Sequence, residues 1–273
     1  MWTRLFGDAS AALASNASSR TLRHYRPVTE DEREDDFDGD QVDPDTWLPY
    51  YLPHWSSREA ARARYTMSQS ILSLRIEADQ APWCPEFDGW LRVSSIQTAN
   101  LAKHRFREGL SEREPQQPLA LFTPRYGRLE VKARAVANPA NMVSLWMIGV
   151  ESRPSWSAEI CIFEIFGRDV GEARARVGMG LHPFGDPRIR DDFERIELAI
   201  DAREFHVYAA EWSPRRVTFS VDDVVVKSSG QSPNYPMQLM LGIYEFADGP
   251  DMTSGPYPKE FAVDWFRAVS TTR

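Results

Sequence analysis

Hydrophobic and polar residues alternate with a period of two along much of this 273-residue chain. In the stretch RLEVKARAV, the apolar residues Leu129, Val131 and Ala133 are separated by charged ones. Successive side chains of a β-strand point to opposite faces of its sheet, so this pattern predicts a strand with one buried and one polar face. The stretches 194–200 and 261–269 repeat the pattern and predict two further strands.

A tight turn is predicted near residue 222. Val217, Phe219 and Val221 share one face of a predicted strand, and the pair Asp222-Asp223 follows it directly. Another apolar run begins at once, so the two strands are expected to form a hairpin.

Helical patterns are nearly absent. Only residues 56–65, SSREAARARY, have a helical composition, with Ser57 as the expected N-cap. Many short strands with almost no helix predict an all-β protein, built as a sandwich or barrel of antiparallel sheets.

The chain is long enough for one large domain, a size that all-β domains commonly reach. Residues 1–33 are rich in Ala and Ser, then in charged residues, which predicts a flexible or loosely docked N-terminal tail. Patterned segments follow, so one domain is expected over residues 34–273. Asp8 interrupts the apolar positions near the start, which is unlike a signal peptide. A monomer is expected.

Composition excludes some classes of partner. The net charge of −8 argues against a nucleic-acid-binding role, which needs clustered Lys and Arg, and is compatible with a neutral sugar ligand. No apolar run approaches the roughly 18 residues of a membrane span. Cys84 and Cys161 lie far apart in the sequence, so no disulfide framework is indicated.

The stretch EICIFE places Glu159 and Glu164 five residues apart within an apolar strand pattern. On a regular strand Glu159 and Cys161 would point to one face and Glu164 to the other; a β-bulge between Cys161 and Glu164 would restore the parity. The two glutamate Cα atoms would then lie about 13 Å apart, and side chains that lean inward would bring the carboxylates to about 5 Å, the spacing of retaining glycosidases. Taken alone, two solvated acids on a strand edge are the simpler interpretation.

Five further segments carry recognisable patterns in a fixed order. They are FDGDQVDPDTW (37–47), PRYGRLEVKAR (124–134), NMVSLWMIG (141–149), EFHVYAAEWSPRRVTFSVDDVVV (204–226) and FAVDWFRAV (261–269), with EICIFEIFG (159–167) in their midst. Together they resemble glycoside hydrolase family 16, the laminarinase and lichenase group, over residues 36–270. The resemblance implies a concanavalin-like jelly-roll β-sandwich, with two antiparallel sheets and a sugar-binding cleft across the concave face.

The resemblance also implies a mechanism. Glu159 corresponds to the nucleophile and Glu164 to the general acid/base, whose proton would be held with the help of the negative charge opposite. The five-residue spacing is that of the bulged branch, which contains endo-β-1,3-glucanases, agarases and carrageenases. The expected function is a retaining, endo-acting glycoside hydrolase that cleaves a β-linked polysaccharide, with β-1,3-glucan as the first choice and galactans not excluded. A transglycosylase, which would make longer products, is an alternative.

Cys161 departs from the family's E-x-D-x-x-E signature, because it replaces the middle aspartate. A thiol is a weak hydrogen-bond donor and is mostly neutral at pH 7. Two interpretations stay open: an enzyme with a retuned carboxylate pair, or a protein that binds sugar with feeble or no hydrolysis. Cys161 itself is expected to fill the former aspartate site, with a covalent nucleophile as the alternative.

Three residues are candidates for substrate binding. Trp146 resembles a family tryptophan that stacks on a sugar ring, with a core tryptophan as the alternative. Trp156 is expected to line the cleft wall or to shield the sheet edge. His182, in GLHPFG, resembles a histidine of the family's cleft, with a structural histidine as the alternative. The aromatic and acidic loop 79–90 would shape the substrate subsites or form a surface excursion.

No cofactor is expected for catalysis, since the five histidines lack zinc-ligand spacing. Some family members bind a structural calcium on the convex face, and Asp36 and Asp264 resemble its ligands; turn acids are the alternative. The expected partner is a polysaccharide or oligosaccharide substrate. Most family members are secreted, and the compartment of this chain stays open.

Overall fold

The computed structural model describes residues 31–102, 112–246 and 255–271. Its elements are β1 (Asp31–Asp35), η2 (Pro53–Trp55), β2 (Tyr65–Ser68), β3 (Ile71–Ile76), α1 (Pro85–Asp88), β4 (Arg92–Gln97), β5 (Gly127–Arg134), β6 (Asn141–Gly149), β7 (Glu159–Phe166), η3 (Gly167–Asp169), β8 (Ala175–His182), β9 (Asp192–Leu198), β10 (His206–Ser213), β11 (Arg216–Val221), β12 (Val224–Ser229), β13 (Met237–Glu245) and β14 (Lys259–Ser270).

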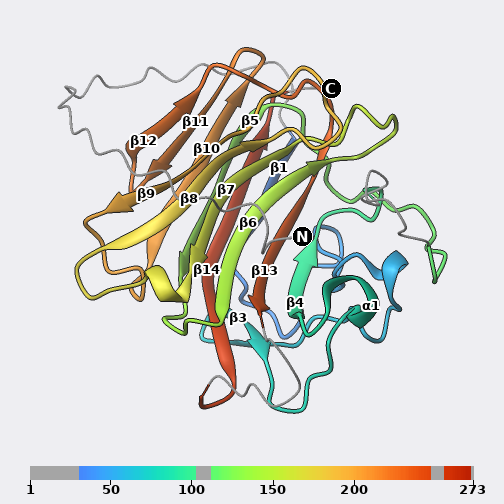
Figure 1. Ribbon diagram of the computed structural model, residues 1–273, viewed down its shortest axis with the longest axis vertical. Coiled ribbons are helices and arrows are strands. Elements are labelled where there is room, and N and C mark those ends of the chain that lie inside the picture. The colour runs from blue at the N-terminus through green and yellow to red at the C-terminus, as the bar shows by residue number, and fades with distance from the viewer. Residues whose placement is uncertain (1–30, 103–111, 247–254, 272–273) are drawn as a thin grey trace.

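The strands form two antiparallel sheets that pack face to face (Figure 1). The eight-stranded sheet has the order β12-β11-β10-β5-β14-β3-β2, with β1 paired to β14. The six-stranded sheet has the order β4-β13-β6-β7-β8-β9, so β7 is an interior strand. The predicted all-β sandwich is confirmed. Of the expected tail, residues 1–30 lie outside the described part of the chain.

The main core lies between the sheets. Strand β5 contributes Leu129, Val131 and Ala133, the apolar positions of its period-two pattern, and all three are buried. Ile160 and Ile165 of β7 meet them from the other sheet within the same apolar cluster. Removal of this apolar surface from water is the main stabilising contribution to such a sandwich.

A second apolar cluster covers the outer face of the six-stranded sheet on its β4 side. Tyr51 packs edge to face against Trp83 at 4.8 Å and Tyr244 at 5.5 Å between ring centres. The loop 79–90, which contains Trp83 and α1, belongs to this layer, and Figure 1 places α1 beside β4. The loop therefore covers a sheet face and is more than a surface excursion.

The predicted hairpin is confirmed. Asp222 and Asp223 join β11 to β12 with φ values of 49° and 62°, the positive values that a type I′ turn requires at both central residues. The side chain of Asp222 also accepts a hydrogen bond from the Val207 N–H at 2.9 Å, which secures the turn against β10.

The helix predicted over residues 56–65 is wrong. Ser57 does cap one turn, since its Oγ accepts a hydrogen bond from the Ala60 N–H at 3.0 Å. The turn ends because Arg62 forms a β-bridge with Tyr50 and β2 begins three residues later. Pairing with neighbouring strands overrides the helical propensity of the Ala and Arg residues. No helix among the described residues is long and apolar enough to cross a membrane.

Candidate active site

Strand β7 carries a β-bulge within the EICIFE stretch. Against β8, Cys161 pairs with Gly180 and Glu164 pairs with Gly178, so three residue steps on β7 match two on β8. The pairing of β7 with β6 shifts at the same place, and Ile162 is left without a partner. The bulge that the spacing of the glutamates required is confirmed.

The bulge decides which side chains share a face. Ile162 and Phe163 are adjacent in sequence, yet both belong to the core between the sheets. Cys161 belongs to the cluster on the outer face instead. By alternation on either side of the bulge, Glu159 and Glu164 join Cys161 on that outer face.

Both glutamates are deeply buried. Each is 1% exposed, and Oε2 of Glu159 has no hydrogen-bond partner among the described residues, while Glu164 has the Cys161 thiol as its hydrogen-bonding neighbour. Burial with so few partners disfavours a charged carboxylate. It raises the pKa of Glu164 to about 8 and raises the pKa of Glu159 well above its ordinary value.

Neighbouring groups modify these pKa values in opposite directions. The charges of Glu164 and of Glu151, a buried acid in the β6–β7 loop, raise the pKa of Glu159 further. The Cys161 thiol and the Arg195 guanidinium partly lower the pKa of Glu164. Burial is therefore the main cause of the raised pKa of Glu164, whereas the sequence had suggested the charge opposite it. The two carboxyl groups compete to hold a single negative charge.

Cys161 lies between the two glutamates on the same face. Burial and both glutamate charges raise the pKa of its thiol well above the ordinary value. Only the thiolate is a strong nucleophile, so a neutral thiol does not favour Cys161 as a covalent nucleophile. That Cys161 fills the place of the family's aspartate stays a prediction.

Trp146 pairs with Cys161 across the β6–β7 ladder and is fully buried on the outer face. Its indole N–H donates a hydrogen bond to the Tyr244 hydroxyl at 3.0 Å. The structure thus brings Trp146 to the carboxylates, and its stacking on a sugar ring stays a prediction.

His182 also reaches the site. It is the partner of Glu159 in the β7–β8 ladder. Its Nδ1 lies 2.6 Å from the Asp191 carboxylate, and its ring stacks on Phe193 with 4.7 Å between ring centres. Its expected contact with substrate stays a prediction.

Trp156 takes a different position. Its indole stacks on Tyr235, with 5.5 Å between ring centres and 14° between planes, and packs against the core between the sheets. The guanidinium of Arg153 lies 5.3 Å from the indole centre. These contacts place the Trp156 ring at the end of the sheet, where it packs against the core between the sheets.

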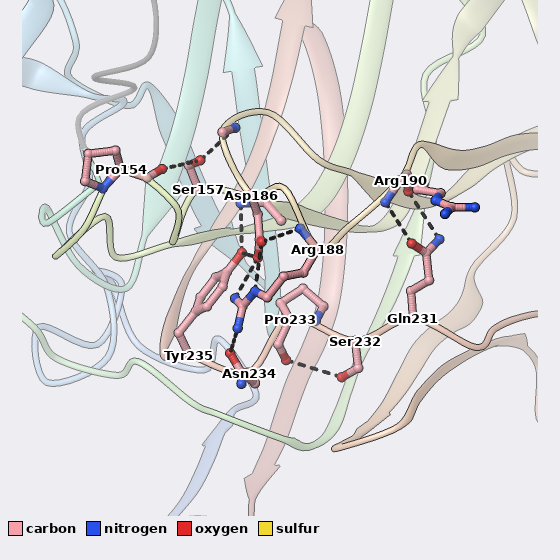
Figure 2. Close-up of polar contacts among 12 residues, drawn as sticks. Pro154, Ser157, Asp186, Arg188, Arg190, Gln231, Ser232, Pro233, Asn234 and Tyr235 are labelled. Carbon is pink, nitrogen blue, oxygen red and sulfur yellow. Dashed lines mark hydrogen bonds and ion pairs between the residues drawn. The ribbon is translucent and has the colours of Figure 1, made fainter.

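A network of three loops fixes the start of β7 (Figure 2). The Tyr235 hydroxyl donates a hydrogen bond to Asp186 at 2.9 Å and accepts one from the Ala158 N–H at 3.0 Å. Arg188 holds the same carboxylate through its side chain and its backbone N–H. Ala158 immediately precedes Glu159, so this network positions the first glutamate. No pattern in the sequence predicted it, because the loops are far apart along the chain.

Asp36 and Asp264, the expected calcium ligands, have other partners. Lys132 Nζ lies 2.6 Å from the Asp264 carboxylate, and Arg267 lies 3.8 Å from that of Asp36. No three His, Cys, Asp or Glu side chains in the described part of the chain gather to hold a metal ion. Calcium binding at Asp36 and Asp264 stays a prediction.

The family model of glycosyl hydrolases family 16 matches residues 120–267, which is more than half of the chain. The chain belongs to glycoside hydrolase family 16. The family expected from the sequence is thereby confirmed. A search of the curated proteins gave no match for this family 16 chain.

Solved structures share its jelly-roll sandwich. A GlcNAcα1-4Gal-releasing endo-β-galactosidase from Clostridium perfringens matches with a TM-score of 0.76 and 28% identity, covering 91% of this chain. This family 16 chain spans 65% of that chain, less than two thirds of its length. A laminarinase from Flavobacterium sp. UMI-01 matches with a TM-score of 0.60 and 16% identity, over 89% of this chain and 99% of that one. A β-glucanase from Bacillus licheniformis matches with a TM-score of 0.59 and 15% identity, over 89% and 98%. The last two show the fold alone.

Proposed function

We propose that this family 16 chain is a retaining, endo-acting glycoside hydrolase of a β-linked polysaccharide, with Glu159 as nucleophile and Glu164 as general acid/base. The bulge at Ile162 carries the proposal, because it puts both carboxyl groups on one face of an interior strand. A strand without the bulge would point one of them into the core.

The reaction proceeds in two displacements. Glu164 gives its proton to the glycosidic oxygen while the Glu159 carboxylate attacks the anomeric carbon, and the bond from that carbon to the leaving oxygen breaks. Glu164 then takes a proton from water, whose oxygen displaces Glu159 from the anomeric carbon. Two inversions give net retention.

The burial of the pair suits this sequence of charges. Before the first step Glu159 is ionised and Glu164 protonated; afterwards Glu159 is an ester and Glu164 is ionised. The site never holds two negative charges, a state that the raised pKa values of both groups disfavour.

Two substrate classes are supported by different observations. The five-residue spacing of the glutamates points to β-1,3-glucan, as the sequence resemblance implied. The higher identity and TM-score of the endo-β-galactosidase structure, compared with the laminarinase, favour a β-galactosidic linkage. We place the β-galactoside class first in the experiment below and the glucan second.

A carbohydrate-binding protein without turnover is the second candidate function. Cys161 supports it, because the neutral thiol replaces the acid of the family signature and leaves Glu159 Oε2 without a hydrogen-bond donor among the described residues.

The deciding experiment measures turnover and affinity together. Wild type, Glu159→Gln and Glu164→Gln are incubated with β-galactans, galactose-containing glycans, β-1,3-glucan and mixed-linkage glucan, and new reducing ends are assayed. We expect wild type to cut one class and both variants to lose at least about a hundredfold in rate while their affinity is kept. The first product should retain the β-anomer in a proton NMR spectrum. Affinity without turnover in wild type would support the binding protein, and products longer than the substrate would support a transglycosylase.

A further inference from the structure

One row of the outer face links three neighbouring strands. Glu164 of β7 pairs with Gly178 of β8, and Gly178 pairs with Arg195 of β9. Strand β8 therefore contributes no side chain between the acid and the cation. The ring of Phe193 packs over Gly178, where an added Cβ would meet it at 2.4 Å. An apolar ring in this place excludes water, so the two charges are weakly screened.

Arg195 is held in place from a second direction. Its guanidinium forms an ion pair with Asp169 of η3, the short helix that directly follows β7. It also lies 5.6 Å from the ring centre of Phe166, the last residue of β7. The Arg195 side chain is 24% exposed and that of Asp169 only 12%. The cation is thus fixed to the strand that carries Glu164.

In the described part of the chain, the other groups that contact Glu164 from its own and the neighbouring strands carry no positive charge. Ser144 is its partner on β6, and Cys161 lies on its own strand. Tyr244 approaches from β13, and the charge of Glu164 contributes to the raised pKa of that tyrosine. Arg195 is the cation whose charge acts on Glu164.

We propose that Arg195 is a positioning residue for the proposed reaction: its charge stabilises the carboxylate that Glu164 becomes when it protonates the leaving oxygen. Asp169 holds the guanidinium in that place. The inference rests on the proposed function. Arg195, a residue of β9, would thus have a charge-setting role: it would favour the ionised form of Glu164 in a site where Cys161, between the two glutamates, is a neutral thiol.

The first test compares leaving groups. The glycone that wild type releases is linked to 2,4-dinitrophenol, which leaves without protonation, and to 4-methoxyphenol, which needs it. For Arg195→Gln we expect kcat/KM on the methoxyphenyl substrate to fall about fivefold to tenfold and kcat/KM on the dinitrophenyl substrate to stay within about twofold. Equal losses on both substrates, or no loss, would overturn the proposal, because a structural defect does not distinguish leaving groups.

The matched control is Arg176→Gln. Arg176 lies on β8 and forms an exposed pair with Glu197, 3.7 Å away on β9. The substitution removes one positive charge from the same sheet, but at a position outside the row of Glu164, Gly178 and Arg195. It should leave the rates on both aryl substrates unchanged. Arg195→Lys keeps the charge and should retain most of the methoxyphenyl rate, and Asp169→Asn, which frees the guanidinium, should lose part of it. A loss in Arg176→Gln equal to that in Arg195→Gln would contradict the assignment.

The second test does not depend on turnover. The carboxyl band of Glu164 is followed against pH by infrared difference spectroscopy, as the spectrum with Glu164 minus that of Glu164→Gln. This difference is measured for two pairs of proteins. In the first pair Arg195 is present, and in the second pair both proteins also carry Arg195→Gln. Loss of the cation should move the titration of Glu164 upward by about one pH unit. If wild type has no turnover and the shift is present, the proposed function fails and the charge-setting role stands. If the titration does not move, the role of Arg195 is refuted whatever the activity.

Discussion

Cys161 pairs directly with Trp146 across the β6–β7 ladder, and both side chains are fully buried. Position 161 is thus flanked by Trp146 in the strand on one side and by Gly180 in the strand on the other. A polar side chain at position 161 would find few partners there except the two glutamates.

Restoring an acid at position 161 should raise activity and lower stability. In Cys161→Asp a protonated carboxyl can donate to Glu159 Oε2, which lacks a donor among the described residues, and so favour the ionised nucleophile. We expect at least about a tenfold increase in kcat, together with a loss of about 2 kcal/mol in the free energy of unfolding from burial of a further polar group. Reducing-end assays and urea unfolding measure the two effects.

Cys161→Ser is the control for this substitution. It supplies a hydroxyl donor without an added acid, so its activity should fall between wild type and Cys161→Asp. Identical rates in all three proteins would show that position 161 has no influence on the nucleophile.

The stability of the protein should decrease as the pH rises above about 5. Glu164 is ionised in the unfolded chain above its ordinary pKa of 4.5, but the folded chain holds its proton up to a pKa of about 8. A group whose folded pKa is raised contributes its full stability below the unfolded pKa and loses it as the pH approaches the folded one. The loss between pH 4.5 and pH 8 is about 5 kcal/mol at most.

Chemical unfolding at pH 5, 6.5 and 8 checks this. The slope should flatten in Glu164→Gln, because a neutral amide does not titrate, and the variant should be more stable than wild type at pH 8. A slope unchanged by the substitution would assign the pH dependence to other groups.

Two buried tyrosines should respond in opposite ways to the loss of their hydroxyl groups. The Tyr208 hydroxyl lies in the core between the sheets without a hydrogen-bond partner among the described residues, whereas that of Tyr235 bonds to Asp186 and Ala158. We expect Tyr208→Phe to raise the free energy of unfolding by about 1 kcal/mol and Tyr235→Phe to lower it by about 2 kcal/mol. Thermal unfolding of both variants measures this, and a loss of stability in Tyr208→Phe would show that its hydroxyl has a partner.

The glycines of β8 should tolerate no side chain. Gly180 has a φ of 142°, and an added Cβ would lie 2.0 Å from the Asp192 carbonyl oxygen. Gly180→Ala should therefore lower the free energy of unfolding by about 2 kcal/mol or more. Gly230→Ala is the control, since nothing lies within 4 Å of its added Cβ, and it should change stability by less than about 0.5 kcal/mol. A fully stable Gly180→Ala would mean that β8 can shift away from β9.

The fold class and the candidate acids could both be predicted from the sequence alone. Period-two patterns such as that of β5 are local, and they specify which side chains a sheet buries regardless of its neighbours. The same local reasoning required a bulge between Cys161 and Glu164, since two glutamates five residues apart cannot otherwise share a face. It failed for residues 56–65, where a β-bridge between Arg62 and Tyr50 outweighed helical propensity.

The surroundings of those acids, in contrast, depend on the tertiary structure. Arg195 reaches Glu164 through the register of three strands, Glu151 reaches Glu159 from a loop, and Tyr235 anchors the residue before Glu159 from a loop far along the chain. Burial and charge depend on which strands are neighbours and in what register. A pattern read along one strand does not contain that information, because the energy of a charge is set by everything that packs around it.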